Sequence, residues 1–526
     1  HPTCSSSGGP VFILRTATFV VDHPGGGGQE AVAEQVAVPT AFPENYRGVI
    51  QSGRVECDVF ELEYEGTLPA AIDGAYYRCG GDPQFPPRIP GLPPAEDFIN
   101  GDGVVSMFRI QDGHVDFKMR YVRTERFLLE RRARRALFGR YRNPFTDDPS
   151  VAGADRTLMN TAMHWHAGRL FALKEDGLAH EIDPFTLDTR GRWDFGGQLR
   201  SRTMTAHPKI DPLSGQWVFN GYSTLGDEVS TDIAFCVADA DGELTQEEWF
   251  QPPYSSMIHD WGVTQEHVIF PIMPLAADPD RLRAGGARWA WDESKPTYLG
   301  VMPRHGSVAD IRYFEGPPRW SFHVMNAFSE GSLVHIDLTV GEVAPFPDPE
   351  GRMPDVSRAP QYLTRWTCDL SKGDGRFEEL RLWDAMPVDF PDIDQRRQTL
   401  PYRHGFMAGR DPAHPGDPRY ATGIWFNSLA HIDHQTGEVE TYYVGDDAAV
   451  QEPVYVRKSD DAEEGDGYLL TVVNRFPEAR GEMLVFDALR LPEGPIATVK
   501  VPLFLRPVTH SNWVSEEQLR RVARTQ

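Results

Sequence analysis

Apolar residues fall into short runs along the chain, and stretches rich in turn-forming residues separate these runs. The 48 glycines and 43 prolines are spread over the whole sequence. Clear examples of the apolar runs lie at 168–174, 216–222, 438–444 and 467–473. Such runs, bounded by Gly and Pro, are typical of short strands joined by hairpins, whereas a helical period is scarce. The pattern predicts an all-β protein.

A weak internal repeat refines this prediction. It occurs at 182–186, 210–215, 336–339 and 432–437, and in each copy an isoleucine is followed by an aspartate and then by a serine or threonine. The carboxylate can accept hydrogen bonds from the backbone of the next turn. Hairpin units repeated over several hundred residues predict a β-propeller, which closes on itself and leaves only short, protected edges. Generic hairpin chemistry is the alternative explanation of the repeat.

Few helices are predicted. The segment 124–137 offers Thr124 as an N-cap residue and places Phe127, Leu128 and Ala136 on one side. A helix that covers a propeller face is favoured here over one that lies on a membrane or a partner. Ser515 and Gln518 form a capping box before a last helix. Residues 1–40 have linker composition and predict an irregular arm, and 41–526 predict one domain.

Charge and composition exclude several classes of protein. The 77 acidic residues outnumber the 52 basic residues, so the net charge of -25 repels nucleic acid and anionic lipid. No apolar run is long enough to insert into a membrane. The five cysteines form no CxxC pair, which favours a reducing, cytoplasmic location. The first residue is His1, which leaves open a targeting segment that was removed.

Four of the 17 histidines stand beside apolar or strand-like residues, in contrast to those in polar turns. They are His207, His259, His323 and His510. Each one alone would more often be a histidine of the core with satisfied hydrogen bonds. Their separations correspond roughly to one, one and several blades, so a propeller can bring all four to its axis.

Several segments that carry polar and histidine motifs occur in a fixed order. They are 98–103 (FINGDG), 141–148 (YRNPFTDD), 160–162 (NTA), 172–177 (ALKEDG), 205–209 (TAHPK), 257–260 (MIHD), 451–454 (QEPV) and 464–468 (EGDGY). Each segment alone is a weak signal, but the full series is specific. Over about residues 50–515 the chain resembles the carotenoid cleavage oxygenases, and within them the branch of lignostilbene and isoeugenol oxygenases.

The resemblance implies a seven-bladed β-propeller whose loops and short helices cap one face over an axial site. There the four histidines would hold a non-haem Fe(2+), with dioxygen as co-substrate and no organic cofactor. Neutral imidazoles suit Fe(2+) and leave coordination positions open. The other ring N–H groups need acceptors, and the resemblance implies Glu175, Asp389 and Glu452. Asp389 stands where the family has a longer glutamate, so a bridging water or a shifted strand is expected there.

The resemblance also implies a phenol-binding pair, Tyr141 and Lys174, that holds the 4-hydroxyl group of the substrate. A buried lysine is costly without a partner, and a phenol or phenolate would supply one. Thr161 is implied to crowd one open position of the iron, which leaves a single position for dioxygen. The wall of the substrate pocket is implied to include Ile99, Phe322 and Thr509.

The expected activity is dioxygen-dependent cleavage of the Cα=Cβ double bond of 4-hydroxyphenylpropenes (isoeugenol, 4-vinylguaiacol) or 4-hydroxystilbenes, which yields vanillin-type aldehydes. Because Ile99 is aliphatic, the chain is more similar to the isoeugenol-cleaving relatives. A small phenolic alkene is the expected partner, and a monomer or homodimer the expected assembly. The alternatives are a carotenoid or apocarotenoid cleavage dioxygenase, a propeller that serves only as a binding scaffold, and a calcium or zinc hydrolase with carboxylate ligands.

Overall fold

A computed structural model describes residues 41–42, 51–92, 94–225, 229–416 and 426–523. The predicted arm, 1–40, lies outside the described residues. The described helices are short: α1 (Pro94–Ile99), α2 (Glu125–Ala133), α3 (Pro279–Arg283) and α4 (Glu516–Ala523). None of these described helices is both long and apolar enough to cross a membrane. The rest is dominated by antiparallel strands, which confirms the all-β prediction.

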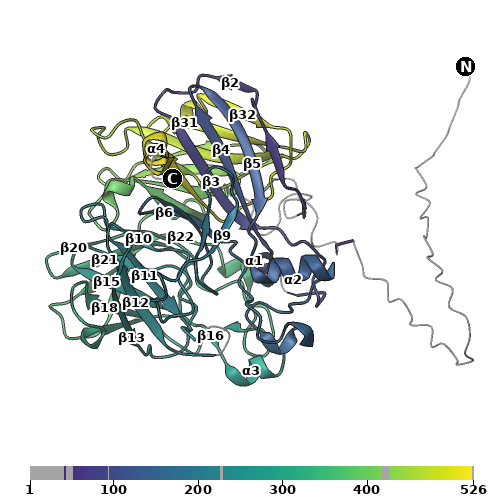
Figure 1. The fold of residues 1–526 in the computed structure, drawn as a ribbon. Coiled ribbons are helices and arrows are strands. Elements are labelled where there is room, and N and C mark those ends of the chain that lie inside the picture. The colour runs from purple at the N-terminus through teal and green to yellow at the C-terminus, as the bar shows by residue number, and fades with distance from the viewer. Residues whose placement is uncertain (1–40, 43–50, 93, 226–228, 417–425, 524–526) are drawn as a thin grey trace, which may run out of the picture. The chain divides into compact units, whose positions relative to one another are not determined.

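Seven sheets form the blades of a propeller ring (Figure 1), numbered here in chain order. Blade 1 contains β33 (His510–Ser515), β3 (Gly74–Gly81), β4 (Gly103–Gln111), β5 (His114–Tyr121) and β1 (Cys57–Val59). Blade 2 contains β6 (Ala162–His166), β7 (Arg169–Leu173), β8 (His180–Ile182) and β9 (Thr189–Arg192). Blade 3 contains β10 (Lys209–Ile210), β11 (Trp217–Tyr222), β12 (Ile233–Ala238) and β13 (Leu244–Phe250).

The same arrangement continues through the remaining blades. Blade 4 contains β14 (Gly262–Val263), β15 (His267–Ile272), β18 (Thr297–Pro303) and β19 (Arg312–Gly316), with a hairpin of β16 (Leu275–Ala277) and β17 (Trp289–Trp291) inserted in the chain. Blade 5 contains β20 (Val324–Glu330), β21 (Leu333–Val340), β22 (Tyr362–Asp369) and β23 (Phe377–Arg381). Blade 6 contains β24 (Val388–Ile393), β25 (His404–Gly409), β26 (Ser428–Asp433) and β27 (Val439–Tyr443). Blade 7 contains β28 (Ala448–Val450), β29 (Val454–Arg457), β30 (Gly467–Arg475), β31 (Arg480–Asp487), β32 (Ala497–Val501) and β2 (Tyr64–Gly66).

Strands from the two ends of the described chain close the ring. The late strand β33 pairs with β3 of blade 1, with Cys79 opposite His510. The early strand β2 pairs with β32 of blade 7, with Tyr64 opposite Val499. Each of these two blades therefore combines early and late segments of the chain, which removes the open edges that a linear array would leave.

The predicted strands and helices are found with small shifts. The four predicted strands correspond to β7, β11, β27 and β30. Thr124 caps α2 by accepting a hydrogen bond from the Phe127 backbone N–H at 3.1 Å. The helix ends at Ala133, earlier than predicted, because Arg134 adopts a left-handed conformation with φ of 54°. Phe127 is buried, but Leu128 is 47% exposed, so its predicted place on the packed side was wrong.

The capping box is also confirmed, since Gln518 N–H donates to Ser515 Oγ at 3.4 Å and Ser515 N–H donates to Gln518 Oε1 at 3.0 Å. Three copies of the aspartate repeat behave as predicted: Asp183, Asp211 and Asp433 accept hydrogen bonds from the following turn. The fourth does not, because Asp337 lies inside β21 and pairs with Arg365 at 2.7 Å. The repeat predicted a strand end there, and the strand instead continues to Val340.

Large aromatic side chains fill the space in and between blades. Trp217, Trp261, Trp320 and Trp366 are among the largest fully buried side chains. Trp217, for example, contacts the rings of His166, Phe171 and Phe219. Buried aromatic area of this size stabilises blade packing by several kcal/mol for each side chain, on the order of 3 to 5 kcal/mol by truncation to alanine. The blades therefore form a rigid frame around the axis.

Candidate metal centre and substrate pocket

In each blade, the innermost strand begins at the same end of the propeller axis. These strands are β33, β6, β10, β14, β20, β24 and β29, and most neighbours among them are in contact. Within three residues of the start of each strand stand, in the order of these strands, His510, Thr161, His207, His259, His323, Asp389 and Glu452. The repeated architecture of the blades thus places one predicted site residue from each blade at a single level of the axis.

The ring nitrogens of the four histidines converge. One ligand atom from each of the four lies within 4.8 Å of the others. The Nε2 atoms of His207 and His259 are 3.2 Å apart, and those of His323 and His510 are 3.0 Å apart. Nitrogen ligands about 2.1 Å from one ion and at right angles to each other would be about 3.0 Å apart. The spacing therefore fits a single metal ion.

Carboxylates hold three of these imidazoles from behind. The Nδ1 atoms of His259, His323 and His510 lie 3.2, 2.7 and 2.7 Å from carboxylate oxygens of Glu175, Asp389 and Glu452, respectively. Because a carboxylate accepts, Nδ1 carries the proton, and the lone pair of Nε2 points to the centre. Two unprotonated nitrogens 3.0 Å apart repel each other unless a cation lies between them. The donor set is compatible with a metal site.

The protonation states agree with this assignment. Burial, followed by the charges of the other histidines, lowers the pKa of His207 well below its ordinary value. Burial raises the pKa of Glu175, but the charge of Lys174 and the interaction with His259 outweigh it and hold the pKa below its ordinary range. The pKa of Asp389 is likewise lowered, because His323 outweighs burial. At neutral pH the carboxylates of Glu175 and Asp389 are therefore ionised, and the imidazole of His207 is free to bind a cation.

The shorter carboxylate of Asp389 reaches its histidine without a bridging water. The pairing of β24 with β25 shifts register between Asp389 and Asp392, and Phe390 adopts a left-handed φ of 51°. This bulge shifts the strand locally, as the second of the two expected arrangements requires. Asp389 Oδ1 also accepts a hydrogen bond from Thr339 at 3.0 Å, which holds the carboxylate in place.

Two residues near the histidines were not predicted. Asp260 lies with one oxygen 3.8 Å from Nδ1 of His207, while its other oxygen accepts from Lys209 Nζ at 2.7 Å. Phe390 stacks on the ring of His323 with centroids 4.9 Å apart. In the sequence, the only indication of a role for Asp260 was its place directly after His259. There was no such indication for Phe390, because a β-bulge sets the orientation of its side chain.

The two residues that the resemblance implies to bind a phenol, Lys174 and Tyr141, are buried against each other. Lys174 is 3% exposed, and its Nζ lies 4.9 Å from the centroid of the Tyr141 ring. Within the part of the chain that the structure describes, the Tyr141 hydroxyl finds no hydrogen-bond partner, while the charge of Lys174 acts on the neighbouring carboxylates of Glu175 and Asp176. Burial raises the pKa of Tyr141 well above its ordinary value, so this phenol stays protonated. A buried donor without a partner costs about 1–3 kcal/mol, which a bound ligand would offset.

The remaining predicted residues surround the histidines. Thr161 O accepts hydrogen bonds from the backbone N–H of His510 at 3.0 Å and from Thr509 Oγ1 at 2.5 Å. Phe322 meets the ring of His259 edge-on at 5.7 Å. Ile99 is tied to this group through its carbonyl, which accepts from Asn160 Nδ2 at 3.1 Å. All four residues therefore come from segments that border the histidine centre.

The fold and the site agree with comparisons to known proteins. Residues 50–515 match the family described as retinal pigment epithelial membrane protein, RPE65. The chain is 43% identical to an isoeugenol monooxygenase of Pseudomonas putida over 89% of this chain and 97% of that protein. It is 40% identical to lignostilbene-α,β-dioxygenase isozyme III of Sphingomonas paucimobilis over 91% and 99% of the two chains.

A solved structure extends the similarity to the fold. The lignostilbene dioxygenase of Pseudomonas brassicacearum superposes with a TM-score of 0.87 at 38% identity, covering 91% of this chain and all of that one. The chain belongs to the RPE65 family of carotenoid cleavage oxygenases. It is an alkene-cleaving oxygenase, and the predicted family and seven-bladed fold are confirmed.

Proposed function

We propose that this chain uses Fe(2+) and dioxygen to cleave the Cα=Cβ bond of 4-hydroxyphenylpropenes or 4-hydroxystilbenes, with a 4-hydroxybenzaldehyde such as vanillin as one product. The observation that carries the proposal is the buried contact of Lys174 with Tyr141, whose hydroxyl has no hydrogen-bond partner among the described residues. A carotenoid offers no phenol to this pair. The relatives named for isoeugenol and lignostilbene, at 43% and 40% identity, support the same substrate class.

The two polar groups have different tasks. Tyr141, which remains protonated, would donate a hydrogen bond to the 4-oxygen of the substrate. The ammonium group of Lys174 would stabilise the phenolate form of that oxygen, which increases the electron density at the conjugated alkene. Iron bound by His207, His259, His323 and His510 would supply the activation of dioxygen.

The phenol pair and the histidine centre share one segment. Lys174 and Glu175 are consecutive residues after β7, so the group that binds the substrate and the acceptor for His259 are joined by a single peptide unit. This connection fixes the distance between the phenolic oxygen and the metal site. A substrate bound by its 4-oxygen would then present its alkene at a reproducible distance from the histidines.

The neighbouring segments would shape the rest of the pocket. Ile99 and Phe322 are half-buried and pack against the large core cluster that contains Tyr141. We assign them to the pocket wall with Thr509, and we assign Thr161 to the edge of one coordination position. These apolar surfaces would exclude water from the reacting alkene. An aliphatic Ile99 leaves room for a small side chain on the alkene and offers no ring for stacking.

An aerobic incubation of the iron-loaded protein tests the proposal. The substrates are isoeugenol, 4-vinylguaiacol, a 4-hydroxystilbene and the 4-methoxy analogue of each, with aldehydes measured by chromatography. Aldehyde from the free phenols and none from the ethers is the expected result. Cleavage of ethers at equal rates would show that the phenol is not recognised. Activity on an apocarotenoid alone would favour the carotenoid alternative.

A further inference from the structure

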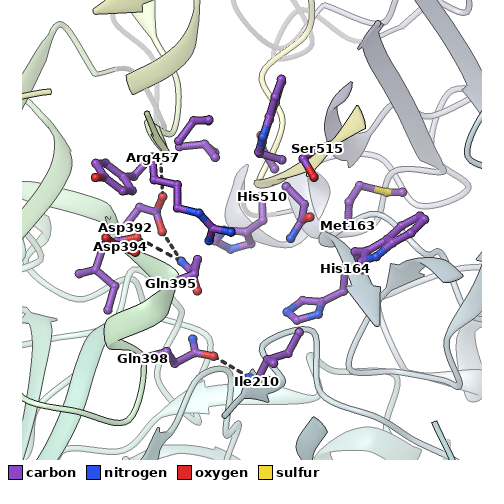
Figure 2. Close-up of a pocket in the computed structure, with 18 of the residues that line it drawn as sticks. Met163, His164, Ile210, Asp392, Asp394, Gln395, Gln398, Arg457, His510 and Ser515 are labelled. Carbon is purple, nitrogen blue, oxygen red and sulfur yellow. Dashed lines mark hydrogen bonds between the residues drawn. The ribbon is translucent and has the colours of Figure 1, made fainter. Parts of the chain in front are cut away.

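A cavity of about 800 Å³ extends along the propeller axis from the histidine centre (Figure 2). It is lined by residues that follow the site residues along the innermost strands, among them Ile210, Asp392 and Arg457. His207, His323 and His510 border it as well. Tyr141, Lys174, Thr161, Phe322 and Thr509 do not line it. The cavity therefore reaches the histidines from the side opposite to the phenol pair.

The wall of this axial cavity is strongly charged. Its carboxylates are Asp73, Asp260, Asp392, Asp394, Asp460, Glu452, Glu516 and Glu517, and its basic side chains are Lys209, Arg457, Lys458 and Arg521. Burial raises the pKa of Asp392 to about 8, so this group is mostly protonated at neutral pH, and the seven other acidic groups still outnumber the four basic groups of the lining. The cavity also opens to solvent, because Asp460, at its rim, has a side chain that is 80% exposed. An excess of carboxylates inside a solvent-filled cavity attracts cations and does nothing for an uncharged molecule.

We propose that the axial cavity is the path by which the metal ion enters and leaves the four-histidine site. The inference rests on the proposed metal centre and not on the identity of the organic substrate. Divalent cations suit carboxylate and water ligands along a path and imidazole ligands at its end. The substrate, with its apolar body, would use the other side, where Ile99 and Phe322 lie.

One contact narrows this path. The backbone N–H of Ile210, in β10 of blade 3, donates to Gln398 Oε1 at 2.6 Å, and Figure 2 shows this bond at the edge of the cavity. Gln398 follows a short turn after β24 and so belongs to blade 6. Blades 3 and 6 are not neighbours in the ring, so the bond crosses the axial opening. Substitutions at these two positions should change the rate of ion passage in opposite directions.

Metal exchange without any substrate tests the path. Apoprotein is mixed with Co(2+), whose bound form is followed by its visible absorbance, and iron-loaded protein is mixed with excess chelator, whose coloured complex reports release. Ile210→Trp should slow both processes by about tenfold or more, because the bulky ring obstructs the opening. Gln398→Ala should accelerate both several-fold. Turnover by Ile210→Trp protein that is already loaded with iron should stay close to wild type.

A charge variant provides a second test that does not depend on fitting a large side chain. Asp460→Lys should slow Co(2+) uptake several-fold at low ionic strength, and the difference should shrink in high salt. The matched control is Asp280→Lys on α3, where the side chain is 92% exposed and does not line the cavity. This control changes the net charge equally and should leave the uptake rate unchanged.

A variant on the opposite side completes the design. Ile99→Trp should reduce turnover of isoeugenol but leave metal uptake and release as in the wild type. Slowed exchange in Ile99→Trp together with normal exchange in Ile210→Trp and Asp460→Lys would overturn the proposal and assign the path to the substrate side. If the wild-type protein bound neither Co(2+) nor Fe(2+), the proposed metal centre itself would be contradicted. Binding with equal rates in all variants would overturn the path alone.

Discussion

Polar side chains on the two sides of the histidine centre differ in their pairing and burial. On the side of the axial cavity, charged side chains are paired: Lys209 binds Asp260 at 2.7 Å in a largely buried pair, and Arg457 pairs with Asp460 at the exposed end. On the other side, Lys174 and Tyr141 are buried against each other, and the Tyr141 hydroxyl makes no hydrogen bond to another described residue. Paired charges at a solvated wall contribute little to stability, whereas buried unpaired donors reduce it.

This contrast helps to locate the substrate. A ligand often completes a buried polar group that has no partner in the protein, so the Tyr141 hydroxyl marks its side as a candidate for binding chemistry. The cavity of about 800 Å³ is lined by neither Lys174 nor Tyr141. The histidines stand between the two regions and can serve both.

The largest effect should come from substituting one of the four histidines that lie between the two sides. His259→Ala takes away one of four nitrogen ligands, so both metal binding and alkene cleavage should be lost. Metal content by elemental analysis and aldehyde formation measure the two losses, and His434→Ala, outside the centre, serves as a matched control. Full iron occupancy in His259→Ala would contradict the ligand assignment.

The next effect should be confined to the substrate side. Lys174→Met keeps the length of the side chain but removes its charge, so cleavage of 4-hydroxy substrates should fall by about 10²–10⁴-fold while the metal is retained. Tyr141→Phe removes one hydrogen bond and should cost about tenfold. Rates and metal content are measured on the same preparations. Unchanged turnover in Lys174→Met would place phenol activation elsewhere.

A smaller effect on metal affinity is expected from substitutions of Asp389, the hydrogen-bond acceptor for His323. Asp389→Asn weakens the acceptor for His323 and should lower metal affinity by about 10–100-fold, whereas Asp389→Glu should restore much of it. The expected order of affinities, measured by competition with a chelator, is wild type, Asp389→Glu, then Asp389→Asn. Equal affinities of wild type and Asp389→Asn would remove Asp389 from the site.

The pH dependence of stability offers a separate check of Asp389. Its pKa in the folded protein is lowered, so its contribution to stability is present above the ordinary pKa of about 3.9 and is lost as pH falls through the lower folded value. The difference in unfolding free energy between wild type and Asp389→Asn should therefore be constant from about pH 5 to 8 and shrink below about pH 4. Denaturant melts at several pH values measure it. A difference that grows at low pH would contradict the assignment.

The smallest effect should come from the helix near the substrate side. Arg126 of α2 donates to Asn100 Oδ1 at 3.0 Å, next to Ile99. Thr124→Ala removes the cap of α2 and should cost about 1 kcal/mol of stability with no change in metal exchange. Thr124→Ser, which keeps the hydroxyl group, is the control. A change in metal exchange on loss of this cap would argue that the two sides are not independent.

Much of this protein could be predicted from local sequence features. Alternating short strands, the aspartate turns at Asp183 and Asp433, and the Thr124 cap depend on neighbours within a few residues, so the sequence contains their causes. The order of the motifs was sufficient to identify the family. The expectations for residues 1–40, for the assembly state and for the cytoplasmic location stay predictions.

Other features depend on contacts between distant segments. The repeat failed at Asp337, because pairing with Arg365 of the next strand keeps β21 extended. The direct bond from Asp389 to His323 depends on the bulge at Phe390, which the pairing of β24 with β25 creates. Asp260 next to His207 and the bond from Ile210 to Gln398 also join different blades.

The sequence by itself determined which residue types are available for chemistry and the family and fold in which they act. Only the tertiary structure decided that Lys174 and Tyr141 are buried against each other and that a charged cavity ends on the opposite side of the histidines. The physical reason is that composition and spacing act locally, whereas burial, hydrogen-bond satisfaction and the sign of a local field are sums over all neighbours that the closed ring brings together.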